Sequence, residues 1–357
     1  ATRALSDGES DPIIDTMMRE EEQRISPDIV HVHHTQFLSS TMQFNVPTVV
    51  TLHDQWAWCA AGGLGLRNGT VCAGPAPEAC AQCHAKWRPA PSTAAQLLTH
   101  TASVLSPIIP PDRLHQLYKK IPAAFRPSPV RGRTHQESPR AAAHRNRTTV
   151  EWYRNADARI APSKHLAALA TANGLGSVEV IPHGLSKEWF QHTDHPRESF
   201  VHLGTIAFHK GTDRVVRAWR EACPEQAPGL LLHGPILDPE AASDHPVGPV
   251  LNPTEIRQTL QTARALVLGS RWPENAPLII LEARAAGCPV IAPNVGGISE
   301  IIEHGRDGLL YENDEELIAA LRLASEATPT QPHPPPRFED QVNQIESIYR
   351  RLVRETA

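Results

Sequence analysis

The sequence contains no apolar run close to the ~20 residues that a helix needs to cross a bilayer, so no membrane-spanning segment is expected. No signal peptide is expected either, and the net charge is only −5 over 357 residues. So weak a charge implies neither a nucleic-acid partner nor an anionic membrane surface. There is no internal repeat and no heptad pattern, which excludes repeat arrays and coiled coils. The length suffices for two domains of ordinary size.

Short apolar segments alternate with helical patterns along most of the chain. We expect strands at 28–34, 47–53, 157–162, 178–182, 199–204, 229–233, 264–269 and 288–292. We expect helices at 11–25, 36–45, 139–155, 212–222 and 338–355, the first with Ile13, Ile14, Met17 and Met18 on one face. This alternation is typical of parallel sheets covered on both faces, and such sheets bind ligands at the carboxyl ends of their strands.

The stretch from Arg271 to Glu300 is the most informative part of the chain. It predicts a loop, a buried helix, a buried strand and a Gly-Gly turn in succession. Pro277 suits a first helical turn, where its missing N–H is not needed. Between Ala276 and Gly287 the helix is apolar on all sides apart from Glu282 and Arg284, and a helix of this kind is buried.

Two carboxylates flank the start of this helix, with Glu274 in the loop before it and Glu282 after seven intervening residues. Arg284 lies two positions from Glu282 and is a poor partner for it, so Glu282 is a candidate ligand-binding group. A helix N-terminus is a ready phosphate site. Taken alone, either glutamate also suits a structural role, as a residue stabilising the helix dipole or as half of an ion pair. Together they suggest a ligand with a phosphate and hydroxyls, such as a sugar nucleotide.

The stretch resembles the E-x7-E signature of retaining glycosyltransferases with the GT-B fold, family 4 in particular. Three further regions agree: PDIVHVHH with PTVVTLHD at 27–54, DARIAPSKHLAALA with VEVIPHGL at 157–185, and FVHLGTIAFHKGTDRVVRAWR at 200–220. The resemblance covers most of the chain except roughly 60–150.

The resemblance implies an α/β protein with two Rossmann-like domains and a cleft between them. We expect an amino-terminal, acceptor-side domain at 1–184, a nucleotide-sugar-binding domain at 185–335, and a terminal helix at 336–357 that packs back on the first domain. In one respect the sequence departs from the family. No strand, glycine-rich turn and helix unit precedes residue 28, so either the chain lacks its true start or this domain is reduced.

By the same resemblance, catalysis is expected to depend on Glu274, His53 and Lys210, with Glu274 binding the sugar ring, His53 facing it from the first domain and Lys210 holding the donor diphosphate. The residues expected to bind the donor are Glu282, which would accept the ribose hydroxyls, together with Gly204, His209, Asn275, Ala276, Pro277, Leu278, Gly296 and Gly297. Family members often carry an arginine where this chain has Thr205, so one phosphate contact is missing or comes from elsewhere.

The implied reaction moves a hexose-type sugar from a nucleotide sugar to a saccharide, lipid-linked or small-molecule acceptor, by same-face displacement with retention. No cofactor and no catalytic metal is required. The missing unit and Thr205 also suit a degenerate GT-B protein that binds sugar nucleotides or assists assembly without turnover. A phosphorylase or a sugar-nucleotide epimerase would share the architecture, but the two motifs at 271–300 and 208–211 argue against both. We expect a cytoplasmic protein, with peripheral contact at the inner membrane face left open.

Two insertions stand apart from this pattern. A loop at 59–83 holds four of the six cysteines, Cys59, Cys72, Cys80 and Cys83. They suit a structural zinc site, two disulfides or four free thiols, and His84 could replace one ligand. The other two cysteines, Cys223 and Cys288, are expected in the core. A Pro- and Arg-rich excursion at 106–139 reads as a solvated loop, with contact to an anionic or lipid-linked acceptor as the alternative.

Overall fold

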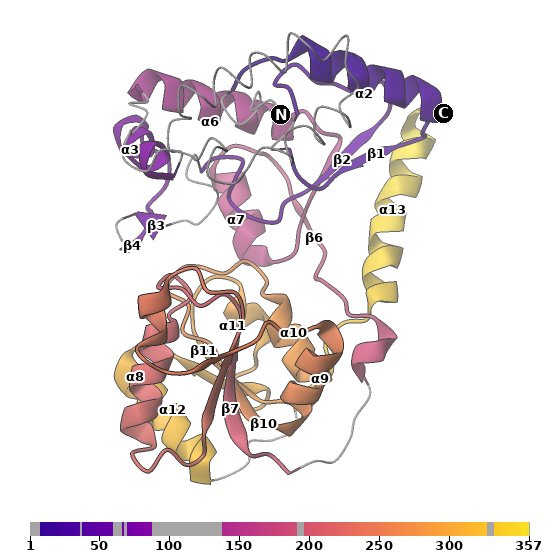
Figure 1. Ribbon diagram of the computed structural model, residues 1–357. Coiled ribbons are helices and arrows are strands. Elements are labelled where there is room, and N and C mark those ends of the chain that lie inside the picture. The colour runs from indigo at the N-terminus through magenta and orange to yellow at the C-terminus, as the bar shows by residue number, and fades with distance from the viewer. Residues whose placement is uncertain are drawn as a thin grey trace, which may run out of the picture.

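The computed structural model describes residues 8–35, 38–59, 66–67, 70–87, 138–190, 196–326 and 332–356. The chain forms two lobes, each built on a parallel sheet, and a long C-terminal helix runs beside both (Figure 1). This is the GT-B arrangement expected from the sequence. Residues 106–137 of the predicted excursion at 106–139 lie outside the described residues. None of the helices within those ranges is long and apolar enough to cross a membrane.

The first lobe contains a four-stranded parallel sheet in the order β1-β2-β5-β6. Its strands are β1 (Val30–Val32), β2 (Thr48–Thr51), β5 (Ala158–Ala161) and β6 (Glu179–Val180). Helices α2 (Pro12–Ile25), α3 (Pro77–Trp87), α6 (Pro139–Arg154) and α7 (Lys164–Ala172) belong to the same lobe, together with a small antiparallel pair, β3 (Leu66–Arg67) and β4 (Thr70–Val71). All four predicted strands of this lobe are therefore confirmed. Ser163 caps α7, because its hydroxyl accepts the N–H of Leu166.

The second lobe contains a six-stranded parallel sheet in the order β12-β11-β10-β7-β8-β9. Its strands are β7 (Ser199–Leu203), β8 (Leu230–His233), β9 (Val247–Gly248), β10 (Ala263–Val267), β11 (Val290–Pro293) and β12 (Gly308–Tyr311). The helices are α8 (Thr212–Ala222), α9 (Pro253–Thr262), α10 (Leu278–Ala285), α11 (Ile298–Ile301) and α12 (Asp314–Glu326), with 3-10 turns η2 (Lys187–Phe190) and η3 (Pro239–Ala242). Chain order reverses between β7 and β10, which makes the gap between these strands the switch point of the sheet.

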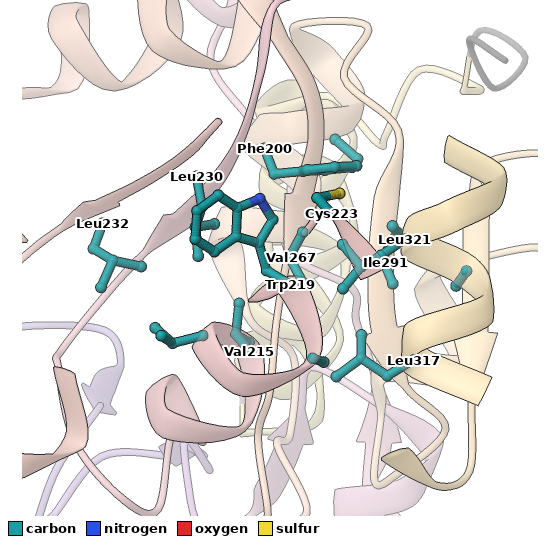
Figure 2. Close-up of a cluster of buried hydrophobic side chains, with 14 of the residues drawn as sticks. Phe200, Val215, Trp219, Cys223, Leu230, Leu232, Val267, Ile291, Leu317 and Leu321 are labelled. Carbon is teal, nitrogen blue, oxygen red and sulfur yellow. The ribbon is translucent and has the colours of Figure 1, made fainter. Parts of the chain in front are cut away.

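Each face of this second sheet carries its own apolar core. On one face, Trp219 of α8 packs with Phe200, Leu230 and Val267 of the sheet, and α12 adds Leu317 and Leu321 (Figure 2). The indole N–H of Trp219 donates to the carbonyl of Pro228 at 2.9 Å, so the ring is buried without an unpaired polar atom. The other face packs against α9 and α10 through Leu260 and Ile280. Cys223 and Cys288 lie in these cores, as predicted.

The last helix, α13 (Phe338–Thr356), belongs to the first lobe by its packing. Ile348 and Leu352 join a buried cluster with Val49, Ile160 and Ile181. The two chain segments that cross between the lobes lie side by side. Leu185 N donates to the carbonyl of Pro336, and Phe338 N donates to the carbonyl of Leu185.

One expectation for the first lobe is wrong. Residues 38–45 form turns rather than a helix, while 36–37 lie outside the described residues. The hydroxyls of Ser39 and Thr41 bond each other, and Thr41 also donates to Asp15 at 2.6 Å. Ser and Thr side chains that bond locally in this way compete with helix formation.

Helix α2 leaves part of its apolar face exposed, with Ile13 64% exposed and Met17 61% exposed. Its contact face is polar instead. Asp15 is buried against Thr41, and the buried carboxylate of Glu22 accepts the backbone N–H of Asn45 at 2.6 Å. The sequence pattern therefore predicted the position of the helix, and polar side chains make its contacts with the rest of the lobe.

Candidate active site in the cleft

A cavity of about 360 Å³ opens at the switch point of the second sheet. The loops that follow β7, β8 and β10 form its walls, and the first turn of α10 closes one side. It is lined by His202, Leu203, Gly204, Thr205, Lys210, His233, Gly234, Pro235, Val250, Leu251, Ile256, Leu268, Ser270, Glu274, Pro277, Leu278 and Ile279. Ligands of open parallel sheets bind in this position, and the apolar lining with few polar groups is typical of a small-molecule site.

Lys210 reaches the cavity because the chain turns sharply after it. Gly211 begins α8 with φ 68°, and a Cβ there would lie 1.9 Å from the carbonyl oxygen of Gly269. Only glycine fits such an approach. Arg271 fastens the same loop by a bidentate pair to Asp213 at 2.6 and 2.8 Å. Among the described residues that line the cavity, Lys210 is the only lysine or arginine.

Glu274 is 8% exposed and lies beside Lys210. Its Oε1 accepts three hydrogen bonds, from Lys210 Nζ at 2.7 Å, Trp272 Nε1 at 2.8 Å and Ser270 Oγ at 2.9 Å. Within the described part of the chain, Oε2 has no such partner. The two residues predicted to contact sugar and phosphate thus form an ion pair at the cavity wall.

Helix α10 presents its first turn to the cavity, as the position of Pro277 predicts. Pro277 is its N-cap, and Leu278 and Ile279 line the cavity. Glu282 follows Leu278 by four residues and Ile279 by three, so all three side chains share one helix face. Burial raises the pKa of Glu282 to about 7. The side chain of Glu282 makes no hydrogen bond or ion pair with the residues that the structure describes.

Arg284 turns away from Glu282, as its spacing predicts. Its guanidinium donates to the carbonyl oxygens of Ile301 at 2.6 Å and His333 at 3.1 Å, and it lies 3.7 Å from the carboxylate of Asp307. The guanidinium of Arg284 therefore makes its contacts on the side of α10 that faces away from Glu282.

The Gly296-Gly297 turn packs against the chain's own backbone. A Cβ on Gly296 would lie 2.3 Å from the carbonyl oxygen of Glu274, and one on Gly297 would lie 1.9 Å from that of Asn275. Gly297 N also donates to the Glu274 carbonyl at 2.7 Å. Neither glycine lines the cavity, so this turn supports the Glu274 loop from behind.

The two lobes meet beside this loop. The side-chain amide of Asn275 donates to the backbone carbonyl of His53 at 3.0 Å, which ties the Glu274 loop to the end of β2. On α11, the carboxylate of Glu300 accepts the backbone N–H groups of Lys164 at 2.7 Å and His165 at 2.6 Å. Glu300 thus satisfies two orphan donors at the start of α7, a helix of the other lobe. No local sequence pattern singles out Glu300, because its partners lie more than a hundred residues away.

His53 belongs to a row of stacked imidazoles at the carboxyl ends of the first sheet. His33 stacks on His31 with 4.3 Å between ring centroids and on His53 with 5.4 Å, and His183 stacks on the far side of His53 at 6.3 Å. At one end of the row, His31 contacts the hydroxyl of Tyr349 on α13. Burial, reinforced by the neighbouring imidazoles, lowers the pKa of His31 and of His53 to about 4.

The remaining predicted donor residues divide into two groups. Gly204 lines the cavity, as does the neighbouring Thr205. His209 lies behind Lys210, with its ring edge-on to Trp272 at 5.8 Å. Ala276 is half-buried in the loop between Asn275 and Pro277 and does not line the cavity.

The hypothesis of a zinc site is not supported. The described residues contain no group of three or more His, Cys, Asp or Glu side chains able to hold a metal ion. Cys59, Cys72, Cys80 and Cys83 form no disulfide among the described residues, and Cys80 is buried against α6, where Asn146 Nδ2 lies 3.7 Å from its sulfur. Of the three alternatives left open by the sequence, zinc is therefore unsupported, and α3 is held by packing against α6.

Residues 197–326, which include the cavity, Lys210 and both glutamates, match the family of glycosyl transferases group 1. The second lobe is a group 1 glycosyltransferase domain. The whole chain resembles sucrose-phosphate synthase from Thermosynechococcus elongatus in fold, with a TM-score of 0.56 and 17% identity over 96% of this chain and 77% of that one. This likeness extends over both lobes and agrees with the GT-B arrangement.

Two curated relatives match parts of the chain. A D-inositol 3-phosphate glycosyltransferase of Paenarthrobacter aurescens is 42% identical over 64 residues, 18% of this chain and 15% of that protein. An exopolysaccharide phosphotransferase of Streptomyces coelicolor is 37% identical over 123 residues, 31% of this chain and 13% of that protein. The chain thus spans less than a sixth of the length of either of these relatives.

Proposed function

We propose that this protein is a retaining glycosyltransferase that moves a hexose-type sugar from a nucleotide-sugar donor to a hydroxyl-bearing acceptor. The observation that carries the proposal is the Lys210–Glu274 pair at the mouth of a cavity whose wall includes the first turn of α10. One cation, one helix N-terminus and one carboxylate with an uncommitted oxygen supply complementary contacts for a diphosphate and a sugar hydroxyl.

In this proposal the nucleoside enters the cavity and the diphosphate lies between Lys210 and the amides at the start of α10. Glu282 accepts the ribose hydroxyls, and Oε2 of Glu274 accepts a hydroxyl of the sugar ring. His53, tied to the same loop through Asn275, faces the sugar from the other lobe. Its lowered pKa keeps the imidazole neutral at physiological pH, so it acts as a hydrogen-bonding group rather than as a cation.

The chemical step replaces one bond by another on the same face of the sugar. The bond between the anomeric carbon and the donor phosphate oxygen breaks, and the acceptor oxygen forms its bond to that carbon. The acceptor proton passes to the departing phosphate, so atoms and charge balance. Lys210 and the α10 dipole stabilise the charge that develops on the leaving diphosphate. Contact between the lobes through Glu300 and Asn275 excludes water, which would otherwise hydrolyse the donor.

Acceptors of three kinds suit this proposal, namely saccharides, lipid-linked sugars and small molecules. An alternative is a protein that binds sugar nucleotides without turnover. Two observations favour it: Glu274 already forms an ion pair with Lys210, and Thr205 offers no charge where a second cation is expected.

A panel of UDP-, GDP- and ADP-sugars, scored by thermal shift and then by release of the nucleoside diphosphate, tests the proposal. We expect one donor to bind and turn over. Lys210→Ala and Glu274→Ala should each lower turnover at least about tenfold with the fold intact, because each removes a charged contact. Lys187→Ala, an exposed lysine outside the cavity, is the control. Binding without turnover would favour the alternative, and wild-type turnover in both variants would refute the proposed roles.

A further inference from the structure

Trp272 lies in the loop between β10 and α10, two residues before Glu274, and its side chain is half-buried. Its indole N–H donates to Glu274 Oε1 at 2.8 Å. The face of the same ring receives the ammonium of Lys210, with 4.7 Å between Nζ and the ring centroid. A single side chain therefore contacts both members of the ion pair through two different kinds of interaction.

The indole N–H determines which oxygen of Glu274 remains available. Lys210, Ser270 and Trp272 all donate to Oε1, so that atom is fully occupied. The three bonds hold the carboxylate in one orientation about the Cγ–Cδ bond. Oε2 is the atom left to accept a ligand hydroxyl. Loss of the indole N–H would leave the carboxylate free to turn, and either oxygen could then pair with Lys210.

The indole face acts on the ammonium. An aromatic face attracts a cation without neutralising its charge or consuming a carboxylate. The indole therefore holds Lys210 beside Glu274 and leaves N–H groups of the ammonium available to a ligand. His209 packs edge-on against Trp272 and restrains the indole. Without the indole, Lys210 would pair more closely with both oxygens of Glu274. This pairing would neutralise the one lysine or arginine charge among the described residues that line the cavity.

We propose that Trp272 is a positioning residue of the donor site, which aims Oε2 of Glu274 at the sugar through its N–H and holds Lys210 for the diphosphate through its ring face. The inference rests on the proposed function, and it assigns a role to a side chain outside the cavity lining. The two contacts separate experimentally, because phenylalanine keeps an aromatic face and lacks the N–H, whereas leucine lacks both.

Binding of UDP, GDP and ADP is measured by calorimetry for the wild type, Trp272→Phe and Trp272→Leu. For the nucleotide that binds best, we expect the leucine variant to lose roughly tenfold in affinity and the phenylalanine variant less than about threefold. Trp219→Phe is the matched control, since it removes an indole N–H bond in the same domain but away from the cavity. Unchanged affinity in Trp272→Leu, with a wild type that binds, overturns this inference alone. No binding by the wild type overturns the proposed function and this inference with it.

Turnover of the corresponding nucleotide sugar, followed as nucleotide release, tests the N–H. Trp272→Phe should lower kcat roughly tenfold with KM within about threefold, because the lost contact orients a group that acts on the sugar. In a Glu274→Gln background the same change should have no further effect on kcat. An equal loss of kcat in both backgrounds would show a general structural role and would refute the positioning role.

Discussion

The buried carboxylate of Glu282 is expected to lower the stability of the folded protein while it serves ligand binding. The variant Glu282→Gln tests this expectation. The carboxylate is half-buried on an apolar helix, and no described group pairs with it. Its pKa rises from 4.5 to about 7 because burial penalises the charged form. Glutamine has nearly the same shape and no charge, so the variant should be more stable than the wild type wherever Glu282 is ionised.

The sign and the size follow from this pKa. A carboxyl whose pKa is higher in the folded state binds its proton more tightly there, so stability is lost as pH rises from about 4.5 to about 7. Each pKa unit corresponds to about 1.4 kcal/mol, which gives roughly 3 kcal/mol for full burial. Partial exposure screens the charge and reduces the expected gain to about 1–2 kcal/mol at pH 8. At pH 4.5 the gain should nearly vanish.

Urea unfolding at pH 8 and pH 4.5, followed by tryptophan fluorescence, measures the effect. Glu225→Gln, an exposed glutamate in the same domain, is the control and should change neither midpoint. A nucleotide sugar that binds the wild type should bind Glu282→Gln more weakly, so stability and affinity move in opposite directions. Equal urea midpoints for wild type and Glu282→Gln at pH 8 would refute the claim that burial of the ionised carboxylate lowers stability.

Three further predictions concern the lobes and their loops. Glu300→Ala should raise hydrogen exchange at the amides of Lys164 and His165 at least about tenfold, and unchanged protection would mean that Glu300 does not hold the lobes together. Gly211→Ala should lower stability by at least about 2 kcal/mol in thermal unfolding, since its φ is 68° and the added Cβ meets a carbonyl oxygen; a wild-type midpoint would contradict this. The pKa of His31 is lowered to about 4, so stability should fall as pH drops from about 6.5 to 4, and His31→Asn should show a shallower fall; identical slopes would exclude the effect.

Much of the fold could be predicted from local patterns. Helix 212–222 occupies the residues expected, and the strands around 200, 230, 265 and 290 lie within a few positions of those expected. Buried parallel strands are continuous apolar runs and are therefore easy to recognise. Four strands were missed. In the second sheet, β9 and β12 are two and four residues long and form the edges, where little apolar sequence is required. The other two, β3 and β4, are a separate antiparallel pair of two residues each.

The candidate site was only partly predictable. The spacing from Glu274 to Glu282 is local and was recognised. The indole of Trp272 was not, because no sequence rule states which nearby donor a carboxylate will choose. The Gly296-Gly297 turn was interpreted as a place for close approach. The close approach exists, but its partner is the Glu274–Asn275 backbone, and that identity is set by tertiary packing.

The final helix has a consequence for how the protein is made. Ile348 and Leu352 complete a cluster whose other members, Val49 and Ile160 among them, emerge from the ribosome far earlier. Chains fold from the amino terminus during synthesis, so one apolar patch on the sheet of the first lobe stays exposed until α13 has been synthesised. Both cores of the second lobe are complete before that point. The first lobe is therefore expected to mature after the second, and a nascent chain stalled before Phe338 should be a target for chaperones.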